Sequence, residues 1–417
     1  MDARSPLRVR TARGYWLPFV VELGQRDTVF VRRPWTPQAR LLGEWAGSFT
    51  LAVDPGYDVV HALNAVPILT RRPYVLTFED HLPRLWADCP IPRLSGWLRR
   101  ELARPRCVAL LAMSEYAMRQ FRAQNRGARE LPALEAKLEL LRPAIRRVRR
   151  EPKRRTADAL RLAFVGTDYF RKGGPALLRA HERLRAAGVP VETTVVSTLA
   201  WSADDYVGPP SDAYVTAERA RLTQPGVVHH AGLPGPEARR VIADADFLVL
   251  PTLHDTFGYV TLEALAVGTP VIATDTCAQP EIVEHGRSRL LLPLESDGEV
   301  GKWPWLDHRE QPGYQGAYEA AIKGLAAALT EQLCRHAPDR AGYRAMSGAA
   351  LERVDERFDE ARARDRLEAL YGRMRAHVVG GDPREDATVG ATAGPASVWR
   401  RGAAPSRGGR RRRVRRG

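Results

Sequence analysis

Two apolar runs flank a short helix in one segment of the chain. ADFLVLP (245–251) is typical of a buried strand, and YVTLEALAV (259–267) has helical spacing. Gly268 and Pro270 end that helix, and TPVIATD (269–275) is rich in the β-branched residues that strands favour. A strand, a crossover helix and a second strand form the parallel α/β unit, so this segment predicts a parallel sheet covered by helices.

The same alternation runs through both halves of the 417-residue chain. Strands are expected at 28–33, 58–63, 73–78, 107–114, 138–143, 160–166, 191–198 and 227–232, and helices at 115–124, 175–188, 237–245, 315–338 and 348–376. Residues 1–27 give no clear first strand. The pattern predicts an α/β fold of two doubly wound, Rossmann-like domains that face a cleft, where a ligand is expected.

Changes in composition indicate where the domains begin and end. We expect a first α/β domain at 1–145, an exposed basic linker at 146–157, a second α/β domain at 158–330 and further helices at 331–378. Residues 379–417 are rich in Arg, Gly, Ala and Pro and have almost no large apolar residues, which predicts a disordered tail.

The net charge of +15 is concentrated in a few segments. From residue 380 onward there are ten arginines and three acidic residues, and 142–155 and 97–106 are also basic. Aromatic residues make up only 7% of the chain and no nucleic-acid module is recognisable. We therefore expect a phosphate-bearing ligand or an anionic membrane surface rather than nucleic acid. Composition drift at an unselected end explains the tail equally well.

The cysteines and the apolar runs limit the compartment. The four cysteines form no CxxC pair and have no histidine cluster beside them, which indicates a reducing compartment and argues against structural zinc. The N-terminus lacks the apolar core of a signal peptide, and no run of 18 apolar residues occurs. We expect a cytoplasmic protein, either free or peripheral at the inner face of the membrane.

Glu263 lies on what looks like a buried helix face. Residues three and four positions away share its face, and they are Tyr259, Val260, Ala266 and Val267. A buried carboxylate without a partner is costly, so a ligand for Glu263 is one explanation. A partly solvated helix glutamate is the other.

A second candidate site follows the strand at 160–166. Arg171 and Lys172 precede Gly173 and the start of a helix, whose free N–H groups attract anions. The loop is neither a Walker A motif nor GxGxxG. It predicts a diphosphate site, although basic residues near helix starts are often only solvated.

Together the two segments resemble the donor domain of retaining glycosyltransferases of the group 1 family, which have the GT-B fold. The resemblance covers residues 158–295 well and the first half loosely. The family carries two acids in E-x7-E spacing, which Asp255 and Glu263 match with Asp in the first position. It implies an acceptor-side first domain and a second domain that binds a nucleotide-diphosphate sugar.

The resemblance also implies individual roles. Glu263 would hold the ribose hydroxyls of the nucleotide, Asp255 the hydroxyls of the transferred sugar, and Lys172 with Arg171 the diphosphate. The backbone N–H groups of Phe257 and Gly258 would face the sugar. Those of Tyr259 and Val260 would face the diphosphate.

Two further segments depart from the family pattern. The Arg that usually stands five residues before Lys172 is Thr167, so Arg171 is the candidate to supply that charge. The usual Gly-Gly before a Pro-Glu pair is Cys277-Ala278, with the Pro-Glu retained.

In the first half, LTFEDHLPR (76–84) follows a strand where the family often has a His-Asp pair. Glu79 takes the His position, Asp80 stays Asp, and His81 is the nearby imidazole. The resemblance makes Glu79 and Asp80 catalytic candidates beside Asp255. A polar loop after a strand explains the same residues.

The resemblance thus implies a retaining, metal-independent glycosyltransferase without a cofactor. It would move a sugar from a nucleotide-diphosphate sugar to a glycan, a lipid-linked or a small-molecule acceptor. The alternatives are a nucleotide-sugar epimerase, which needs no acceptor, and a non-catalytic nucleotide- or glycan-binding module.

Overall fold

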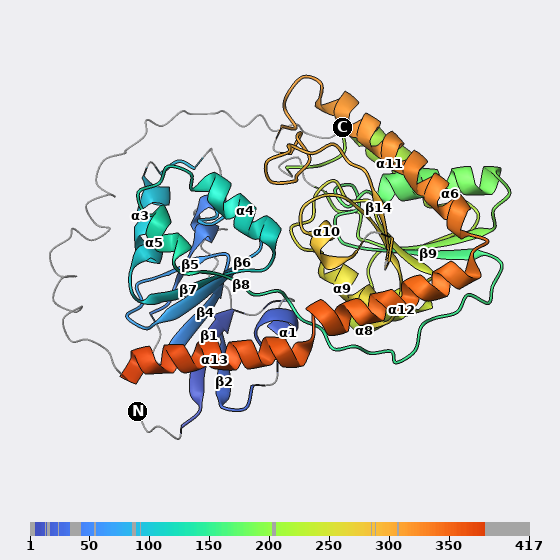
Figure 1. Cartoon of the computed structure of the whole chain (residues 1–417). Helices are drawn as coiled ribbons and strands as arrows, with labels where there is room; N and C mark the ends of the chain where they lie inside the picture. The colour runs from blue at the N-terminus through green and yellow to red at the C-terminus, as the bar shows by residue number, and fades with distance from the viewer. Residues whose placement is uncertain are drawn as a thin grey trace, which may run out of the picture.

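The computed structural model describes most of the chain and shows two α/β domains side by side (Figure 1). The described residues are 5–12, 14, 17–23, 25–33, 43–53, 56–85, 89–91, 93–201, 206–284, 286–287, 289–306 and 308–379. The tail expected at 379–417 lies outside them from residue 380 onward.

The first domain is built on a six-stranded parallel sheet in the order β2–β1–β4–β6–β7–β8. Its strands are β1 (Leu7–Ala12), β2 (Thr28–Arg33), β4 (Val59–Leu63), β6 (Tyr74–Phe78), β7 (Cys107–Ala112) and β8 (Leu138–Leu140), and β3 (Phe49–Leu51) pairs separately with β5 (Val66–Ile68). The helical segments are α1 (Leu17–Val20), η1 (Glu44–Ser48), α3 (Leu94–Ala103), α4 (Glu115–Gln124) and α5 (Leu131–Glu135). The central strand β6 is buried along its whole length, as a parallel strand covered on both faces should be.

The second domain has a parallel sheet in the order β11–β10–β9–β12–β13–β14. Its strands are β9 (Leu160–Val165), β10 (Val191–Val196), β11 (Val227–His230), β12 (Phe247–Leu250), β13 (Val271–Thr274) and β14 (Arg289–Leu292). The helices are α6 (Gly174–Ala186), α7 (Asp212–Arg221), α8 (Gly235–Asp244), α9 (Tyr259–Ala266), α10 (Gln279–Ile282) and α11 (Tyr314–His336). The strand order reverses between β9 and β12, which is where doubly wound sheets bind ligands. The prediction of two doubly wound domains is confirmed.

Among the described strands, sequence reasoning missed four, namely β1, β3, β5 and β14. β1 (LRVRTA) lies within the residues that showed no clear strand, because two arginines interrupt its apolar pattern. Arg10 is nevertheless buried: its guanidinium donates a hydrogen bond to the Leu51 carbonyl at 2.8 Å and lies over the Tyr57 ring. Partners contributed by distant residues therefore make an inward-facing arginine acceptable.

The prediction of one continuous helix at 348–376 is wrong, because two separate helices cover this range. α12 (Arg340–Arg357) packs against α9 of the second domain, and α13 (Glu360–Val379) crosses to the first sheet (Figure 1). Buried Phe358 ends α12, and the Asp359 carboxylate accepts the Arg362 N–H at 2.9 Å near the start of α13. The break lets one segment hold both domains.

A buried histidine fastens α13 to the first sheet. His61 Nδ1 lies 2.8 Å from the Tyr371 hydroxyl, and Nε2 lies 2.7 Å from Thr77 Oγ1. Burial lowers the pKa of His61 to about 3. In the unfolded chain the pKa is about 6.5, so the unfolded state takes up this proton first as the pH falls.

Stability is therefore expected to fall between pH 6.5 and pH 3, and this single group should contribute about 2 kcal/mol of the loss from pH 7 to pH 5. His61→Gln removes the titration, so urea unfolding at pH 7 and pH 5 should show a loss smaller by that amount. His377→Gln, at an exposed position of α13, is the control and should behave like the parent. Equal losses in parent and His61→Gln would contradict the prediction.

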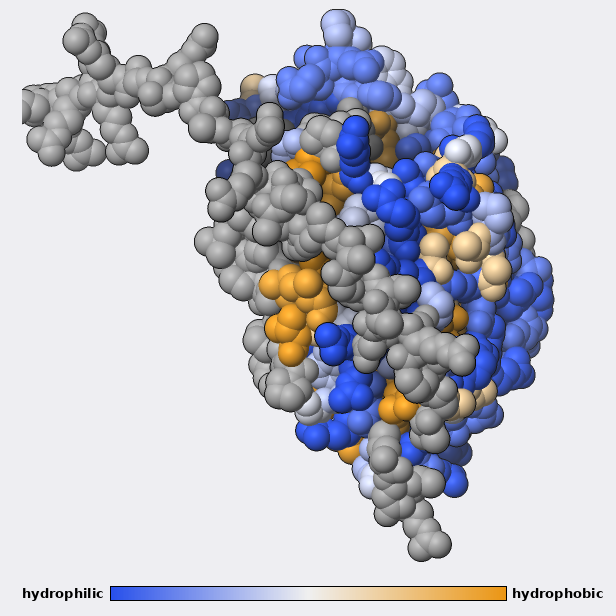
Figure 2. Space-filling model, turned by 90° about the vertical axis from the view of Figure 1, so that its left-hand side faces the viewer, coloured by the Kyte–Doolittle hydropathy of each residue, from blue (hydrophilic) through white to orange (hydrophobic). Residues whose placement is uncertain are grey.

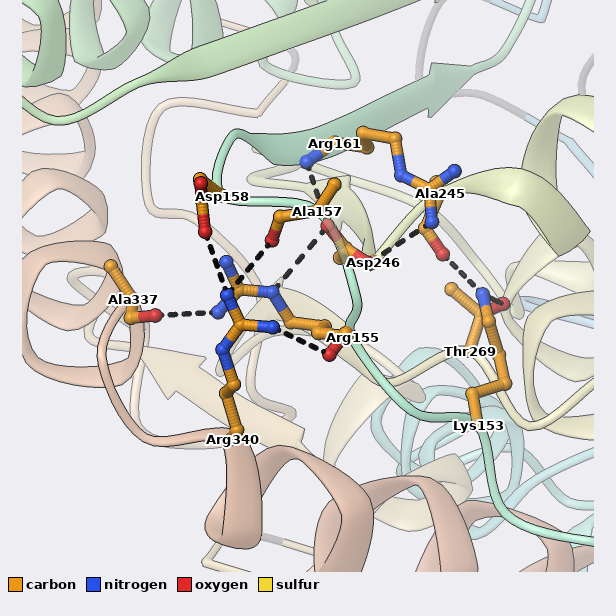
Figure 3. A network of polar contacts seen from close by, with 10 residues as sticks. All are labelled: Lys153, Arg155, Ala157, Asp158, Arg161, Ala245, Asp246, Thr269, Ala337 and Arg340. Atoms are coloured by element: carbon orange, nitrogen blue, oxygen red, sulfur yellow. Dashed lines mark hydrogen bonds and ion pairs between the residues drawn. The ribbon is translucent and has the colours of Figure 1, made fainter.

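The basic linker is not wholly exposed, contrary to expectation. Lys153 is only 6% exposed; its Nζ donates to Thr269 Oγ1 at 3.0 Å and to the Ala245 carbonyl (Figure 3). Arg155, at 5% exposed, lies 3.5 Å from the Asp246 carboxylate. Backbone carbonyls and one carboxylate of the second domain thus compensate two buried charges, which the sequence analysis had expected to be exposed to solvent.

The basic segment at 97–106 is also largely engaged within the fold. Arg104 and Arg106 both pair with Glu101, and Arg99 lies 3.7 Å from Glu130. Among the residues that Figure 2 colours on this side of the molecule, hydrophilic ones predominate and apolar ones gather in small areas. None of the described helices is long and apolar enough to cross a membrane. An anionic membrane surface as partner stays a prediction.

Candidate functional site

The loop between β9 and α6 is shaped by a glycine that no other residue can replace. Gly173 has a φ of +77°, and a Cβ there would lie 1.8 Å from the Pro251 carbonyl oxygen. The loop after β9 is thereby pressed against the loop after β12. These are the two loops at the reversal of the strand order, so their functional residues come together.

This packing brings Lys172 and Asp255 together as an ion pair. Lys172 Nζ lies 3.0 Å from Asp255 Oδ2, and Asp255 is 9% exposed. Burial alone disfavours the ionised carboxylate, but the charges of Lys172 and Arg171 outweigh it and lower the pKa of Asp255. Asp255 is therefore an anion at neutral pH, held beside a cation at the ligand end of the sheet.

The guanidinium of Arg171 already has several partners within the protein. Its guanidinium donates to the His254 carbonyl at 2.8 Å, pairs with Asp168 and lies 5.7 Å from the centre of the Tyr206 ring. It thus holds the loop that carries Asp255. Its contact with a diphosphate stays a prediction.

The start of α9 is built around Gly258. This residue has a φ of +87°, and a Cβ would lie 2.2 Å from Gln279 Nε2. Tyr259 and Val260 form the first turn of α9, where backbone N–H groups have no acceptor within the helix. Phe257 is buried just before it. The predicted N–H donors therefore lie at a helix start, with their roles still predictions.

Glu263 faces inward on α9, as its helical neighbours indicated. It is 7% exposed, and its Oε1 lies 3.4 Å from Nη1 of Arg239 on α8. The side chain of Arg239 is half exposed. An ion pair with such a partner is weak, so it accounts for only part of the cost of burying Glu263.

The first-domain candidates follow β6. Glu79 accepts a hydrogen bond from Asn64 Nδ2 at 2.9 Å, and burial raises its pKa. Burial also acts to raise the pKa of Asp80, but the hydrogen bond and charge of His81, with the charges of His254 and Arg84, lower it overall. Two adjacent carboxyl groups thus differ in acidity.

The two candidate regions meet through Tyr116 of α4. Its hydroxyl donates to Asp80 Oδ1 at 3.2 Å and lies 3.4 Å from His254 Nε2 of the second domain. Glu281 spans the same interface, since its carboxylate accepts the backbone N–H groups of Glu115 at 2.7 Å and Tyr116 at 2.6 Å. The catalytic candidates of both domains are therefore brought together.

Sequence reasoning missed Tyr116, His254 and Tyr206. His254 directly precedes Asp255, and this adjacency was the one available signal. Nothing in the local pattern of Tyr116 or Tyr206 distinguishes it from a core tyrosine. Cys277, where the family usually has Gly, has a φ of +52°, a conformation that glycine adopts more easily.

Within the described ranges, no group of three or more His, Cys, Asp or Glu side chains is arranged to hold a metal ion. The adjacent pair Asp204 and Asp205 lies outside those ranges.

The second domain is similar to a known family. Residues 159–301 match the family model described as glycosyl transferases group 1. This segment contains both loops, the Lys172–Asp255 pair and Glu263. Residues 159–301 are a group 1 glycosyl transferase domain. The resemblance to the donor domain of group 1 glycosyltransferases, noted in the sequence, is confirmed for these residues.

Curated relatives include a glycosyltransferase and a synthase. A D-inositol 3-phosphate glycosyltransferase of Jonesia denitrificans is 36% identical over 169 residues, which cover 39% of this chain and 34% of the relative. An alpha-maltose-1-phosphate synthase of Mycolicibacterium smegmatis is 28% identical over 144 residues, covering 34% and 31%. The chain therefore spans about a third of the length of these relatives.

Solved structures match over both domains. A glycosyltransferase of Rickettsia africae has a TM-score of 0.56 at 11% identity and covers 90% of this chain and 100% of its own. Anabaena HepE in complex with UDP-glucose has a TM-score of 0.55 at 14% identity, covering 88% and 99%. The expected GT-B fold is thus confirmed beyond the group 1 domain.

Proposed function

We propose that the protein is a retaining glycosyltransferase that uses a nucleoside-diphosphate sugar. The observation that carries the proposal is the Lys172–Asp255 pair at the reversal of the second sheet, beside the start of α9. The Lys172 ammonium group and the free N–H groups at the helix start can bind a diphosphate. The adjacent Asp255 carboxylate can accept hydrogen bonds from sugar hydroxyls. That Anabaena HepE is solved with UDP-glucose supports a nucleotide-sugar donor.

In this proposal, negative charge develops on the departing diphosphate as the sugar bond breaks. Lys172, Arg171 and the N-terminus of α9 stabilise that charge more strongly in the transition state than in the ground state. Asp255 positions the transferred sugar, and Glu263 binds the ribose. Asp80 and Glu79 approach from the first domain, where a glycan, lipid-linked or small-molecule hydroxyl acceptor binds. No cofactor or metal takes part.

The test is a panel of UDP-, GDP- and ADP-sugars with and without candidate hydroxyl acceptors, assayed for nucleoside diphosphate release. We expect one donor to be turned over with retention at the anomeric carbon. Conversion of the donor into an epimer would instead identify an epimerase, and binding without turnover a binding module.

Metal independence gives a separate expected result. Donor affinity, measured by calorimetry, should change less than about two-fold after EDTA treatment, because protein cations and helix N–H groups neutralise the diphosphate. Loss of donor binding in EDTA, with recovery on adding Mg²⁺ or Mn²⁺, would reject this part of the proposal.

A further inference from the structure

His254 occupies the contact between the two domains, next to the proposed sugar-binding carboxylate. It is 2% exposed, and the Tyr206 ring meets its imidazole edge-on at 5.4 Å between ring centres. Its backbone carbonyl is fixed by Arg171 Nη1 at 2.8 Å and Thr252 Oγ1 at 2.9 Å. Both the backbone and the ring of His254 are therefore held in place.

The hydrogen bonds around Tyr116 define which imidazole nitrogen carries the proton. Asp80 is ionised, because its pKa is lowered, so it can only accept, and the single hydroxyl hydrogen of Tyr116 goes to it at 3.2 Å. The Tyr116 oxygen then accepts from His254 Nε2–H at 3.4 Å. Burial lowers the pKa of His254 to about 4, so the ring is neutral and Nδ1 carries a lone pair.

That lone pair is unused within the described part of the chain. His254 Nδ1 is buried and accepts no hydrogen bond from any described residue. A buried polar atom without a partner is costly, and such atoms gather at functional sites. Asp80 of the first domain and Asp255 of the second are both close enough to the ring to affect its pKa.

We propose that His254 Nδ1 accepts a hydrogen bond from a substrate hydroxyl, which makes His254 a specificity-determining residue of this protein. This inference rests on the proposed function. The position of His254 beside Asp255 on the donor domain favours a hydroxyl of the transferred sugar. A hydroxyl of the acceptor has the same chemistry, and the experiment separates the two sources.

Two substitutions test the two nitrogens separately. His254→Asn keeps a polar acceptor near the position of Nδ1, and His254→Gln keeps a polar group near that of Nε2, facing Tyr116. Calorimetry without acceptor compares the affinity for UDP-glucose with that for UDP, or the corresponding pair for the donor that the panel selects. The difference between the two ligands isolates the sugar.

For a donor-sugar hydroxyl, His254→Gln should weaken nucleotide-sugar binding about ten-fold, while His254→Asn stays within about three-fold of the parent. Neither change should alter the affinity for the nucleoside diphosphate. For an acceptor hydroxyl, donor binding is unchanged and the acceptor KM rises in His254→Gln alone. Equal effects of the two substitutions on every ligand, or no effect of either, would overturn the proposal.

A measurement on the unaltered protein keeps the test independent of how the variants fold. Donors and acceptors that each lack one hydroxyl should include one that loses about ten-fold in affinity or in kcat/KM. If removal of no single hydroxyl has an effect above about two-fold, the inference is wrong. If the parent binds no nucleotide sugar at all, it is the proposed function that fails.

Discussion

Asp255→Asn is expected to lower kcat for sugar transfer by about 10²- to 10³-fold, the usual effect of removing one precisely aimed electrostatic group. The substitution keeps the size of the side chain and removes its negative charge. In the protein that charge is neutralised by Lys172 Nζ at 3.0 Å. The expected loss is in turnover because the proposed partner of Asp255 is the reacting sugar.

Binding of the nucleoside diphosphate should respond differently. Without the Asp255 carboxylate, Lys172 is released from its ion pair and the diphosphate no longer faces a nearby anion. The affinity should therefore be unchanged or slightly higher, as measured by calorimetry. Asp244→Asn, an exposed carboxylate at the end of α8, is the matched control and should leave both quantities unchanged. A large loss of diphosphate affinity in Asp255→Asn would reject the assignment of Asp255 to the sugar.

Glu263→Gln is expected to weaken nucleoside diphosphate binding about ten- to a hundred-fold, since a carboxylate that accepts two ribose hydroxyls makes bonds worth about 1.5–3 kcal/mol each. The amide offers one oxygen and no charge. The unliganded variant should be about as stable as the parent, because the change also removes a buried charge whose paired arginine is half exposed.

The ion pair with Arg239 provides the control for this prediction. If Glu263 serves only that pair, Glu263→Gln and Arg239→Gln should lower the melting temperature alike and leave nucleotide affinity unchanged. If Glu263 binds ribose, only Glu263→Gln should reduce affinity, while Arg239→Gln has a small effect on stability. Parallel measurements of melting temperature and affinity distinguish the two roles.

Sequence reasoning was most reliable where a structure depends on neighbouring residues. The strand at 245–251, the helix at 259–267 and the strand at 269–275 all appear, as β12, α9 and β13, because apolar periodicity and the Gly-Thr-Pro stop are local. It failed where distant residues compensate for a local defect. β1 was missed because Arg10 interrupts its apolar pattern. The buried charge of Arg10 is compensated by a hydrogen bond to the Leu51 carbonyl and a cation–π contact with the Tyr57 ring.

By itself, the sequence determined that the chain has two doubly wound domains, that Lys172 and Asp255 lie in loops after strands of the second, and that Glu263 lies on a helix. Only the tertiary structure decided that Lys172 and Asp255 form a pair, because the reversal of strand order places their loops together. It alone decided that Tyr116 and His254 meet, although 138 residues separate them. Spacing along a chain fixes which face of an element a side chain occupies, whereas contacts between elements depend on how whole sheets and domains pack.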